Sequence, residues 1–298
     1  MSSVSRLVCA LGVLTVCVTS IADARSMVTH LVVPAPLRAA AATSNAGELR
    51  VCADPNNLPF SNAAGRGFEN VLASRIAAAR HERLRVVWLP QRRAYLRHTL
   101  GAGVCDLVMG VVGARGSAQT TRPYYRSTYV FVRRAGSAPI SSLDDARLRT
   151  WRVGIPIVGE DYENPPPAEA LAVRGLANQV RGFPVYGDYS KPDPTRGLID
   201  AVAAGAIDVA IAWGPIAGYF APLASTPLRL APVAPSFDAR IAMPFTFDVR
   251  MAVRRGDAAL LAWLNRYLDE HAREIHDELA RFGVPLLPPA GEEKERAS

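Results

Sequence analysis

Lysine is almost absent from this sequence of 298 residues, since Lys191 and Lys294 are the only two. The net charge of +7 therefore rests on arginine, and the arginines are scattered along the chain among aspartate and glutamate. A nucleic-acid groove needs basic residues gathered on one element. The scatter instead predicts a solvated basic surface that would suit an acidic partner, and we expect no binding of nucleic acid.

Long apolar runs are also lacking once the N-terminus is passed, so we expect no later segment to span a bilayer. Residues 7–18 do form an apolar run behind Arg6, and Ala22-Asp23-Ala24 follows it. A charged start, an apolar run and an A-x-A site are typical of a secretory signal. We expect a signal peptide over residues 1–24, cleavage after Ala24 and a periplasmic location; the alternative is a retained membrane anchor.

Cysteine and histidine are scarce, with four and five residues. Signal cleavage would remove Cys9 and Cys17 and leave Cys52 and Cys105. In an oxidising compartment two cysteines suggest one disulfide, although two separate buried thiols are the alternative. No CxxC or histidine-rich spacing indicates a metal, and we expect neither a metal nor a cofactor.

An internal repeat organises the middle of the chain. Leu49-Arg50-Val51 is matched 102 residues later by Trp151-Arg152-Val153, and the step from Gly103 to Asp106 is matched at the same offset by Gly205 to Asp208. Each Gly-x-x-Asp step follows a helical stretch and precedes the apolar run of a buried parallel strand. Two matches at one offset predict two similar lobes.

Each lobe is predicted to alternate strands and helices. Alternation implies parallel sheets covered on both faces, with ligands bound beyond the carboxyl ends of the strands. The expected strands are 49–53, 84–89, 105–112, 151–157, 181–186 and 207–213, and the expected helices are 68–80, 92–101, 166–175 and 195–204.

Two further strands, at residues 124–132 and 245–253, are predicted to cross between the lobes as a double hinge. The helices after Asp257 would then return to the first lobe. The expected limits are lobe 1 at 48–132 and 249–288, lobe 2 at 133–248, a flexible leader at 25–47 and a polar tail at 289–298.

Longer motifs across residues 48–288 resemble a known family. Among them are VCADPNNLPFSN, WLPQRRAYLRHTLGAGVCDLVMGV, TTRPYYRSTYVFVRR and AIDVAIAWGPIAGYF. They are similar to the quinoprotein dehydrogenase-associated substrate-binding proteins of the MoxJ/XoxJ type, within solute-binding protein family 3. The resemblance implies the α/β fold of type II periplasmic binding proteins, with two lobes, each a mostly parallel sheet flanked by helices, and two crossover strands as the hinge.

The same resemblance implies a non-catalytic accessory protein of a PQQ-dependent methanol or alcohol dehydrogenase. Expected partners are that dehydrogenase, its c-type cytochrome and a small-molecule ligand, and we expect a monomer. Closure of the lobes on a ligand or partner segment would activate or mature the enzyme. The alternative is the receptor of an ABC importer for a small polar solute. An enzyme on this fold, such as a periplasmic dehydratase, would need a general acid or base in its cleft. The histidine nearest the expected cleft is His98, which its helix should carry away from it, so we expect no catalytic activity.

The expected cleft lies where the strands end. Asp54, Asn56 and Asn57 follow the first strand and offer one acceptor and two amides, or form an Asx-Pro turn. Tyr124 and Tyr125 are adjacent strand residues, so only one of them can face the cleft. Further candidates are Phe60, Gln91, Arg92, Arg93, Gly159, Asp161, Tyr186 and Trp213.

The charge of the ligand is less defined. Arg92 and Arg93, after the second strand, could hold a carboxylate or the acidic surface of a partner; the alternative is a solvated helix start. Arg115, near the place where amino-acid-binding relatives grip an α-carboxylate, lacks their Thr-x-x-Arg pattern. Glu160, Asp161 and Glu163 add negative charge before the third predicted helix. Amino-acid binding and an anionic ligand are therefore disfavoured, and a cation remains open.

Overall fold

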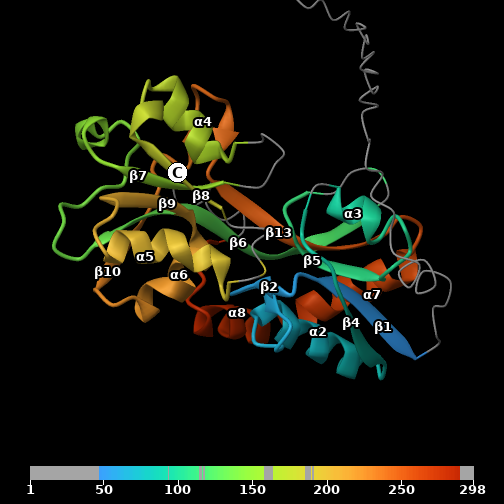
Figure 1. Cartoon of the computed structure of the whole chain (residues 1–298). Coiled ribbons are helices and arrows are strands. Elements are labelled where there is room, and N and C mark those ends of the chain that lie inside the picture. The colour runs from blue at the N-terminus through green and yellow to red at the C-terminus, as the bar shows by residue number, and fades with distance from the viewer. Residues whose placement is uncertain are drawn as a thin grey trace, which may run out of the picture. The chain divides into compact units, whose positions relative to one another are not determined.

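The computed structural model describes residues 47–92, 94–113, 116, 118–157, 164–184, 189 and 191–288. All of them belong to one compact unit of the chain (Figure 1). Nine strands form one sheet in the order β4-β1-β5-β13-β6-β9-β7-β8, with β10 also paired to β6. The two ends of this sheet are built alike, and we call the end around β1 the first lobe and the end around β7 the second lobe.

The first lobe is centred on β1 (Glu48–Ala53), which runs parallel to β4 (Arg83–Trp88) and β5 (Leu107–Val111). Val51 pairs with Val86 on one side and with Leu107 on the other. Helix α2 (Phe68–Ala79) covers one face, because its apolar residues recur at helical spacing and are buried. The disulfide Cys52–Cys105 lies among buried residues of a separate cluster.

The second lobe repeats this arrangement. β7 (Val153–Ile157) runs parallel to β8 (Val180–Pro184) and β9 (Val209–Trp213), and Val153 pairs with Val209. This is the register of Val51 and Leu107 moved by 102 residues, as the sequence repeat predicted. Helices α4 (Pro166–Val173) and α5 (Gly197–Ala203) contribute to two apolar clusters of this lobe.

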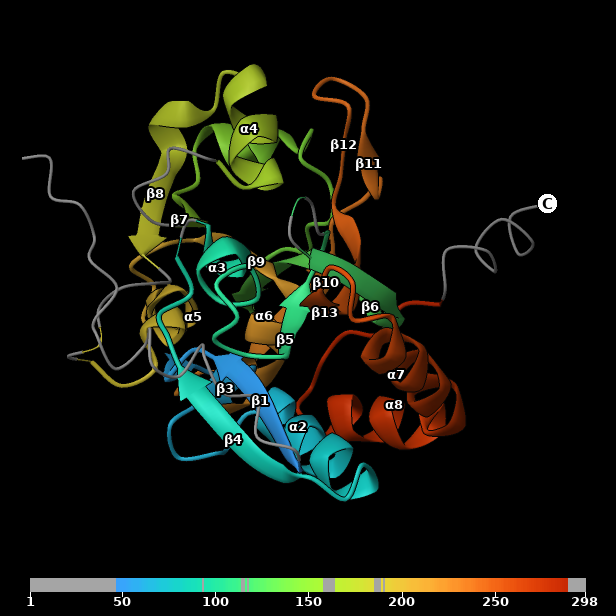
Figure 2. The same ribbon diagram turned by 90° about the vertical axis from the view of Figure 1, so that its right-hand side faces the viewer.

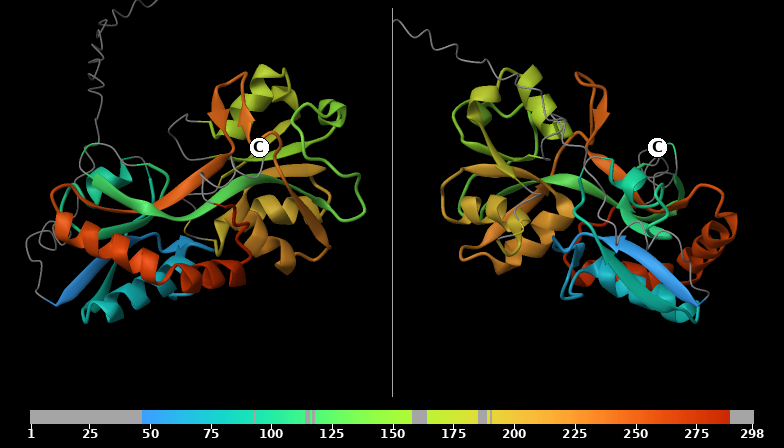
Figure 3. Two further views of the ribbon diagram at one scale, coloured as in Figure 1. Left: turned by 180° about the vertical axis from the view of Figure 1, so that it is seen from behind. Right: turned by 45° about the vertical axis from the view of Figure 1, so that its right-hand side comes forward.

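Two antiparallel strands join the lobes, as expected from their apolar sequences. β6 (Ala118–Arg134) pairs with β13 (Thr246–Arg254) over its first part, and from Tyr129 onward it pairs with β9. β10 (Leu228–Pro232) adds to the same end of β6. Figure 3 shows both long strands running from one lobe into the other, and Figure 2 is a view from the first-lobe side, with β4, β1 and α2 in front.

The C-terminal helices pack on the first lobe (Figure 3). α7 (Ala258–Glu270) begins at Asp257, whose carboxylate accepts a hydrogen bond from Leu260 N at 3.1 Å. α8 (Ala272–Arg281) is followed by Gly283, which has φ of +71°. A Cβ on Gly218 of α6 (Gly214–Phe220) would lie 1.8 Å from the carbonyl oxygen of Gly283, so this approach requires glycine.

One expected helix is much shorter than predicted. Residues 92–101 were expected to be helical, but α3 spans only Tyr95–His98. Ala94 has a left-handed φ of 58°, which prevents the helix from starting earlier, and Thr99 leaves the helical region. The remaining short elements are β2 (Asn56–Asn57), β3 (Ser61–Asn62), β11 (Phe237–Asp238), β12 (Met243–Pro244) and the 3-10 turns Ala146–Arg149, Ala177–Gln179, Pro194–Arg196 and Ala221–Leu223.

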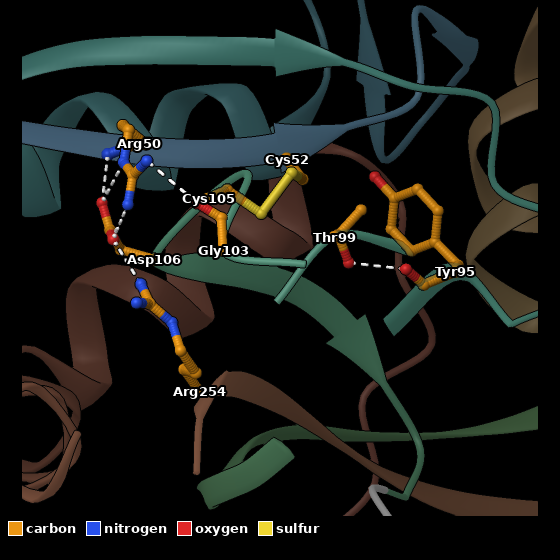
Figure 4. The surroundings of a disulfide bond; sticks show 8 residues. All are labelled: Arg50, Cys52, Tyr95, Thr99, Gly103, Cys105, Asp106 and Arg254. Carbon is orange, nitrogen blue, oxygen red and sulfur yellow. Dashed lines mark hydrogen bonds and ion pairs between the residues drawn. A yellow bond between two sulfur atoms is a disulfide. The ribbon is translucent and has the colours of Figure 1, made fainter. Parts of the chain in front are cut away.

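In each lobe an arginine near the start of the first strand binds the Gly-x-x-Asp motif just before a neighbouring strand, and we call this contact the arginine clamp. Arg50 donates to both carboxylate oxygens of Asp106, at 3.0 and 2.7 Å, and to the carbonyl oxygen of Gly103 (Figure 4). In the second lobe Arg152 contacts Asp208 and the Gly205 carbonyl in the same way. The repeated Gly-x-x-Asp motif is therefore a structural device at the end of the sheet opposite the expected cleft.

None of the helices in the described part of the chain has the length and apolar character needed to cross a membrane.

Candidate functional site

A cavity of about 240 Å³ lies between the lobes, beyond the carboxyl ends of their central strands. Its walls come from the first lobe, the second lobe and both crossing strands. A second hollow of about 670 Å³ lies beside it and shares Gln91, Gly110 and Val112 with it. The residues that line the first cavity are Asn57, Phe60, Glu69, Gln91, Gly110, Val112, Tyr125, Tyr129, Pro156, Trp213, Ile216, Phe247 and Val249.

The loop after β1 is held in place by a buried carboxylate. Asp54, 3 % exposed, accepts hydrogen bonds from the backbone N–H groups of Asn56 and Gln91, each at 2.8 Å. Its second oxygen also accepts from the Tyr189 hydroxyl at 2.8 Å. Asp54 therefore fixes the backbone at Asn56 and Gln91. Its bond from Asn56 N forms the predicted Asx turn, and its bond from Tyr189 is a contact to the second lobe.

Asn57 and Gln91 form the polar corner of the cavity. The Asn57 side-chain amide donates to Gln91 Oε1 at 3.2 Å. Asn57 is 3 % exposed, and its Oδ1 is buried with no hydrogen-bond partner in the described structure. An unsatisfied buried acceptor costs about 1–3 kcal/mol, so a ligand that donates to Asn57 Oδ1 would recover this cost.

Aromatic rings make up much of the remaining wall. Tyr129 on β6, Trp213 at the end of β9 and Phe247 on β13 contact one another edge to face, with centroids 5.3–6.3 Å apart. Phe60 and Tyr125 line the cavity from the first-lobe side, and both pack against Phe68. The cavity is thus apolar on several sides, as ligand sites commonly are.

A single carboxyl group from the start of α2 reaches this cavity. Glu69 lies against Gly110, where an added Cβ would come within 2.5 Å of Glu69 Oε1. Desolvation by burial raises the pKa of Glu69 from 4.5 to about 8, and the charge of Asp54 adds to the rise, while the Tyr124 hydroxyl opposes it. Burial also raises the pKa of Tyr124. At neutral pH the Glu69 carboxyl is therefore mostly protonated.

Hydrogen bonds also join the two lobes through the loop after β1. Asn56 donates to the carbonyl oxygen of Lys191 at 2.7 Å and accepts from Asp193 N at 3.2 Å. Thr195 Oγ1 donates to the carbonyl oxygen of Leu58 at 3.0 Å, and the Leu58 side chain is buried in an apolar cluster of the second lobe. The long polar loop after β1 therefore bridges the two lobes.

The predicted site residues fall into three groups. Asn57, Phe60, Gln91, Tyr125 and Trp213 line the cavity. Of the other predicted residues in the described chain, Asp54 and Asn56 make contacts between the lobes, Tyr124 packs behind the wall near Glu69, and Arg92 is exposed. Predictions that lie outside the described residues are Arg93, Arg115, Gly159, Asp161 and Tyr186.

Several lining residues were not predicted. Tyr129 lies four residues after Tyr125 on one strand, and strand alternation could have placed both on the same face. Phe247 was expected in a crossing strand but was not assigned to the cleft. Glu69 gave no signal, because an acidic residue in the first turn of a helix is ordinary.

The described residues give no sign of a metal site, since no group of three or more His, Cys, Asp or Glu side chains could hold an ion. The cavity presents amide groups, one carboxyl group and aromatic rings. This set of groups can bind a small molecule or a side chain of a partner.

Comparison with known proteins gave the following relatives. The chain is 35 % identical over 263 residues to protein MoxJ of Methylorubrum extorquens, covering 84 % of this chain and 85 % of that protein. It is 28 % identical over 266 residues to protein MoxJ of Paracoccus denitrificans, covering 84 % and 93 %. No family model matches the chain.

Solved structures give the same result. The crystal structure of periplasmic binding protein XoxJ from Methylobacterium extorquens AM1 matches with a TM-score of 0.65 and 34 % identity, covering 81 % of this chain and 100 % of that one. The crystal structure of MxaJ from Methylophaga aminisulfidivorans MPT matches with a TM-score of 0.68 and 28 % identity, covering 80 % and 100 %. The two-lobe fold predicted from the sequence is therefore confirmed.

Proposed function

Since this chain belongs to the MoxJ family of periplasmic binding proteins, we propose that it is a non-catalytic accessory protein of a PQQ-dependent methanol or alcohol dehydrogenase. It would act in the periplasm after cleavage of residues 1–24, as a monomer, with lobes limited to 48–132 with 249–288 and to 133–248. Its role would be to activate or mature the dehydrogenase, with the c-type cytochrome as a further partner.

The observation that carries this proposal is the cavity whose walls come from both lobes and both crossing strands. A site assembled in this way exists only when the lobes are together, so occupancy and closure are coupled. A ligand or a segment of the dehydrogenase would bind there, and the crossing strands would serve as the hinge.

The contacts between the lobes suggest how closure is stabilised. Asn56 uses both ends of its side-chain amide for the second lobe, and Tyr189 reaches back to Asp54. Each such hydrogen bond contributes about 0.5–1.5 kcal/mol. This is small enough for the lobes to open when the site is empty, and large enough to favour closure once a ligand adds its own contacts.

Calorimetric titration of the mature protein into the purified PQQ-dependent dehydrogenase from the same source tests the proposal. We expect a dissociation constant in the micromolar range or tighter, together with a change in dehydrogenase activity. Asn56→Ala should weaken association, because it removes two contacts between the lobes. Asn178→Ala, at an exposed position of the second lobe, is the matched control and should bind like the wild type.

The opposite outcome would favour transport. Absence of any association with the dehydrogenase, together with a small polar solute retained by the purified protein, would identify the chain as the receptor of an ABC importer.

A further inference from the structure

We propose that the cavity between the lobes binds a small organic ammonium ion, whose N–H groups donate to Asn57 Oδ1 and to the Glu69 carboxylate and whose carbon body lies against the aromatic wall. This inference rests on the proposed function, because it names the chemical class of ligand on which the two lobes would close.

The first argument is the hydrogen-bonding character of the wall. Only 3 % of the surface of Asn57 is exposed, and its Oδ1 has no hydrogen-bond partner among the described residues. One N–H of its side-chain amide donates to Gln91 Oε1, whereas the buried atom of Asn57 that lacks a partner, Oδ1, is an acceptor. A ligand that satisfies it must bring a donor.

The second argument is charge. Of the described residues that line the cavity, Glu69 is the only one with an acidic or basic side chain. A carboxylate ligand would therefore meet the Asn57 oxygen and the Glu69 carboxyl without a described cationic partner in the wall. An ammonium ion supplies N–H donors for the Asn57 oxygen, and its positive charge favours the ionised form of the Glu69 carboxyl, which then accepts a charge-assisted hydrogen bond.

The third argument is the aromatic wall. Phe60, Tyr125, Tyr129, Trp213 and Phe247 all line the cavity. The planes of Tyr129, Trp213 and Phe247 stand at 62–77° to one another, so the wall presents rings in several orientations. Aromatic rings attract a nearby cation through their quadrupole and also cover its carbon atoms. The volume of about 240 Å³ limits the ligand to a small molecule.

Binding of a cation here should be linked to release of a proton. The groups that act on the Glu69 carboxyl are Asp54 on the loop after β1 and Tyr124 on β6, and the carboxyl in turn acts on Tyr95 of α3. A cation beside this carboxyl favours its ionised form, which burial disfavours. Affinity should therefore rise as the pH increases from 6 toward the Glu69 pKa of about 8.

The test uses three probes with one carbon skeleton: benzylammonium, benzyl alcohol and benzoate. Titration calorimetry of the full mature chain at pH 7.5 should show benzylammonium binding at least about tenfold more tightly than either of the others, a difference typical of one desolvated charged contact. Parallel titrations in phosphate and Tris should show proton release with benzylammonium only.

Variants assign the effect to the cavity. Glu69→Gln keeps the size of the side chain and should remove the preference for benzylammonium over benzyl alcohol. Glu169→Gln, which removes a carboxylate from the first turn of α4 at an exposed position, is the matched control and should keep the preference. Thermal unfolding of each variant is measured first, so that loss of the fold is distinguished from loss of selectivity.

The wild-type result alone can overturn the inference. Tighter binding of benzoate, equal binding of all three probes, or no binding of any probe at millimolar concentration would contradict it. Association with the dehydrogenase is a separate measurement, so it can succeed when the ammonium site fails, and the two proposals can be rejected independently.

Discussion

Cys52 and Cys105 form a disulfide in the first lobe, and the residues 102 positions later in the second lobe, Gly154 and Ile207, also touch. The Ile207 side chain lies so close that a Cβ on Gly154 would come within 2.4 Å of its Cδ1. One location in the repeat is therefore joined by a covalent bond in one lobe and by close packing in the other.

The two arginine clamps also differ between the lobes, because the clamp of the first lobe is more deeply buried. The side chains of Arg50 and Asp106 are 2 % and 14 % exposed, whereas those of Arg152 and Asp208 are 48 % and 26 % exposed. Arg254 adds a second contact to Asp106 at 3.0 Å. The hydrogen-bond pattern is thus shared, but only the first lobe places it in a buried, crosslinked setting. This clamp lies near the start of β1, and the loop that carries Asn57 and Phe60 follows the other end of the same strand.

The clamp should show the largest difference between the lobes. Asp106→Asn would leave the buried Arg50 without its counter-charge and should lower the free energy of unfolding by about 3–5 kcal/mol. Asp208→Asn breaks a more exposed pair and should cost about 0–1 kcal/mol. Urea unfolding of both variants measures this, and equal losses would show that burial does not separate the two clamps.

The disulfide should have the next largest effect. It closes a separation of 53 residues, for which the chain-entropy model gives about 4 kcal/mol. Cys52→Ala with Cys105→Ala should lower the unfolding free energy by roughly this amount, and a reducing agent should affect the wild type but not the double variant. Ile207 occupies the position of Cys105 in the second lobe, and Ile207→Val should lower the unfolding free energy by only about 0.5–1.5 kcal/mol. A double variant as stable as the wild type would contradict the expected crosslinking role.

The close packing in the second lobe should have a smaller effect. Gly154→Ala places a methyl group within 2.4 Å of Ile207 and 2.6 Å of Leu198 and should cost about 1–3 kcal/mol. Gly113→Ala, with nothing within 4 Å, is the control and should stay within about 0.5 kcal/mol of the wild type. Thermal unfolding of the two variants measures these costs. If Gly154→Ala were as stable as the wild type, the lobe would be able to relax at this position.

The smallest effect should appear in acid. Hydrogen bonds from the Arg152 side chain hold the pKa of Asp208 below its ordinary 3.8. Since the folded pKa is lowered, the clamp stabilises the fold above about pH 3.8 and loses this contribution as the pH falls through the lower folded value. The stability difference between wild type and Asp208→Asn should shrink below that pH. A difference that grows in acid would give the wrong sign.

Much of the fold could be predicted from local pattern. The matched Gly-x-x-Asp steps predicted two lobes, and Gly103 and Gly205 both have left-handed φ, of 68° and 73°. Gly205 directly follows the C-cap of α5, as expected, but Gly103 lies in a turn after α3 has ended at His98, so it does not end that helix. The apolar runs predicted the strands for the same local reason. The length of helix 92–101 was overestimated, because the sequence gives no indication that Ala94 adopts a left-handed conformation.

The site was harder to predict, because it depends on which residues meet across the lobes. Asn57 and Trp213 could be expected at the cavity because each follows a strand end. The contacts of Asn56 with Lys191 and Asp193 depend on residues more than a hundred positions away, and Glu69 reaches the cavity only because Gly110 leaves space for it. Such pairings cannot be read from one sequence.

Hydrogen exchange of the mature protein, alone and with the purified PQQ-dependent dehydrogenase, most directly tests whether the cavity between the lobes is the functional end of the molecule. The expected result is new protection at residues 54–60 and 191–195, with the clamp segments 103–106 and 205–208 unchanged. Protection confined to the clamp segments, or no change at any segment, would contradict this assignment.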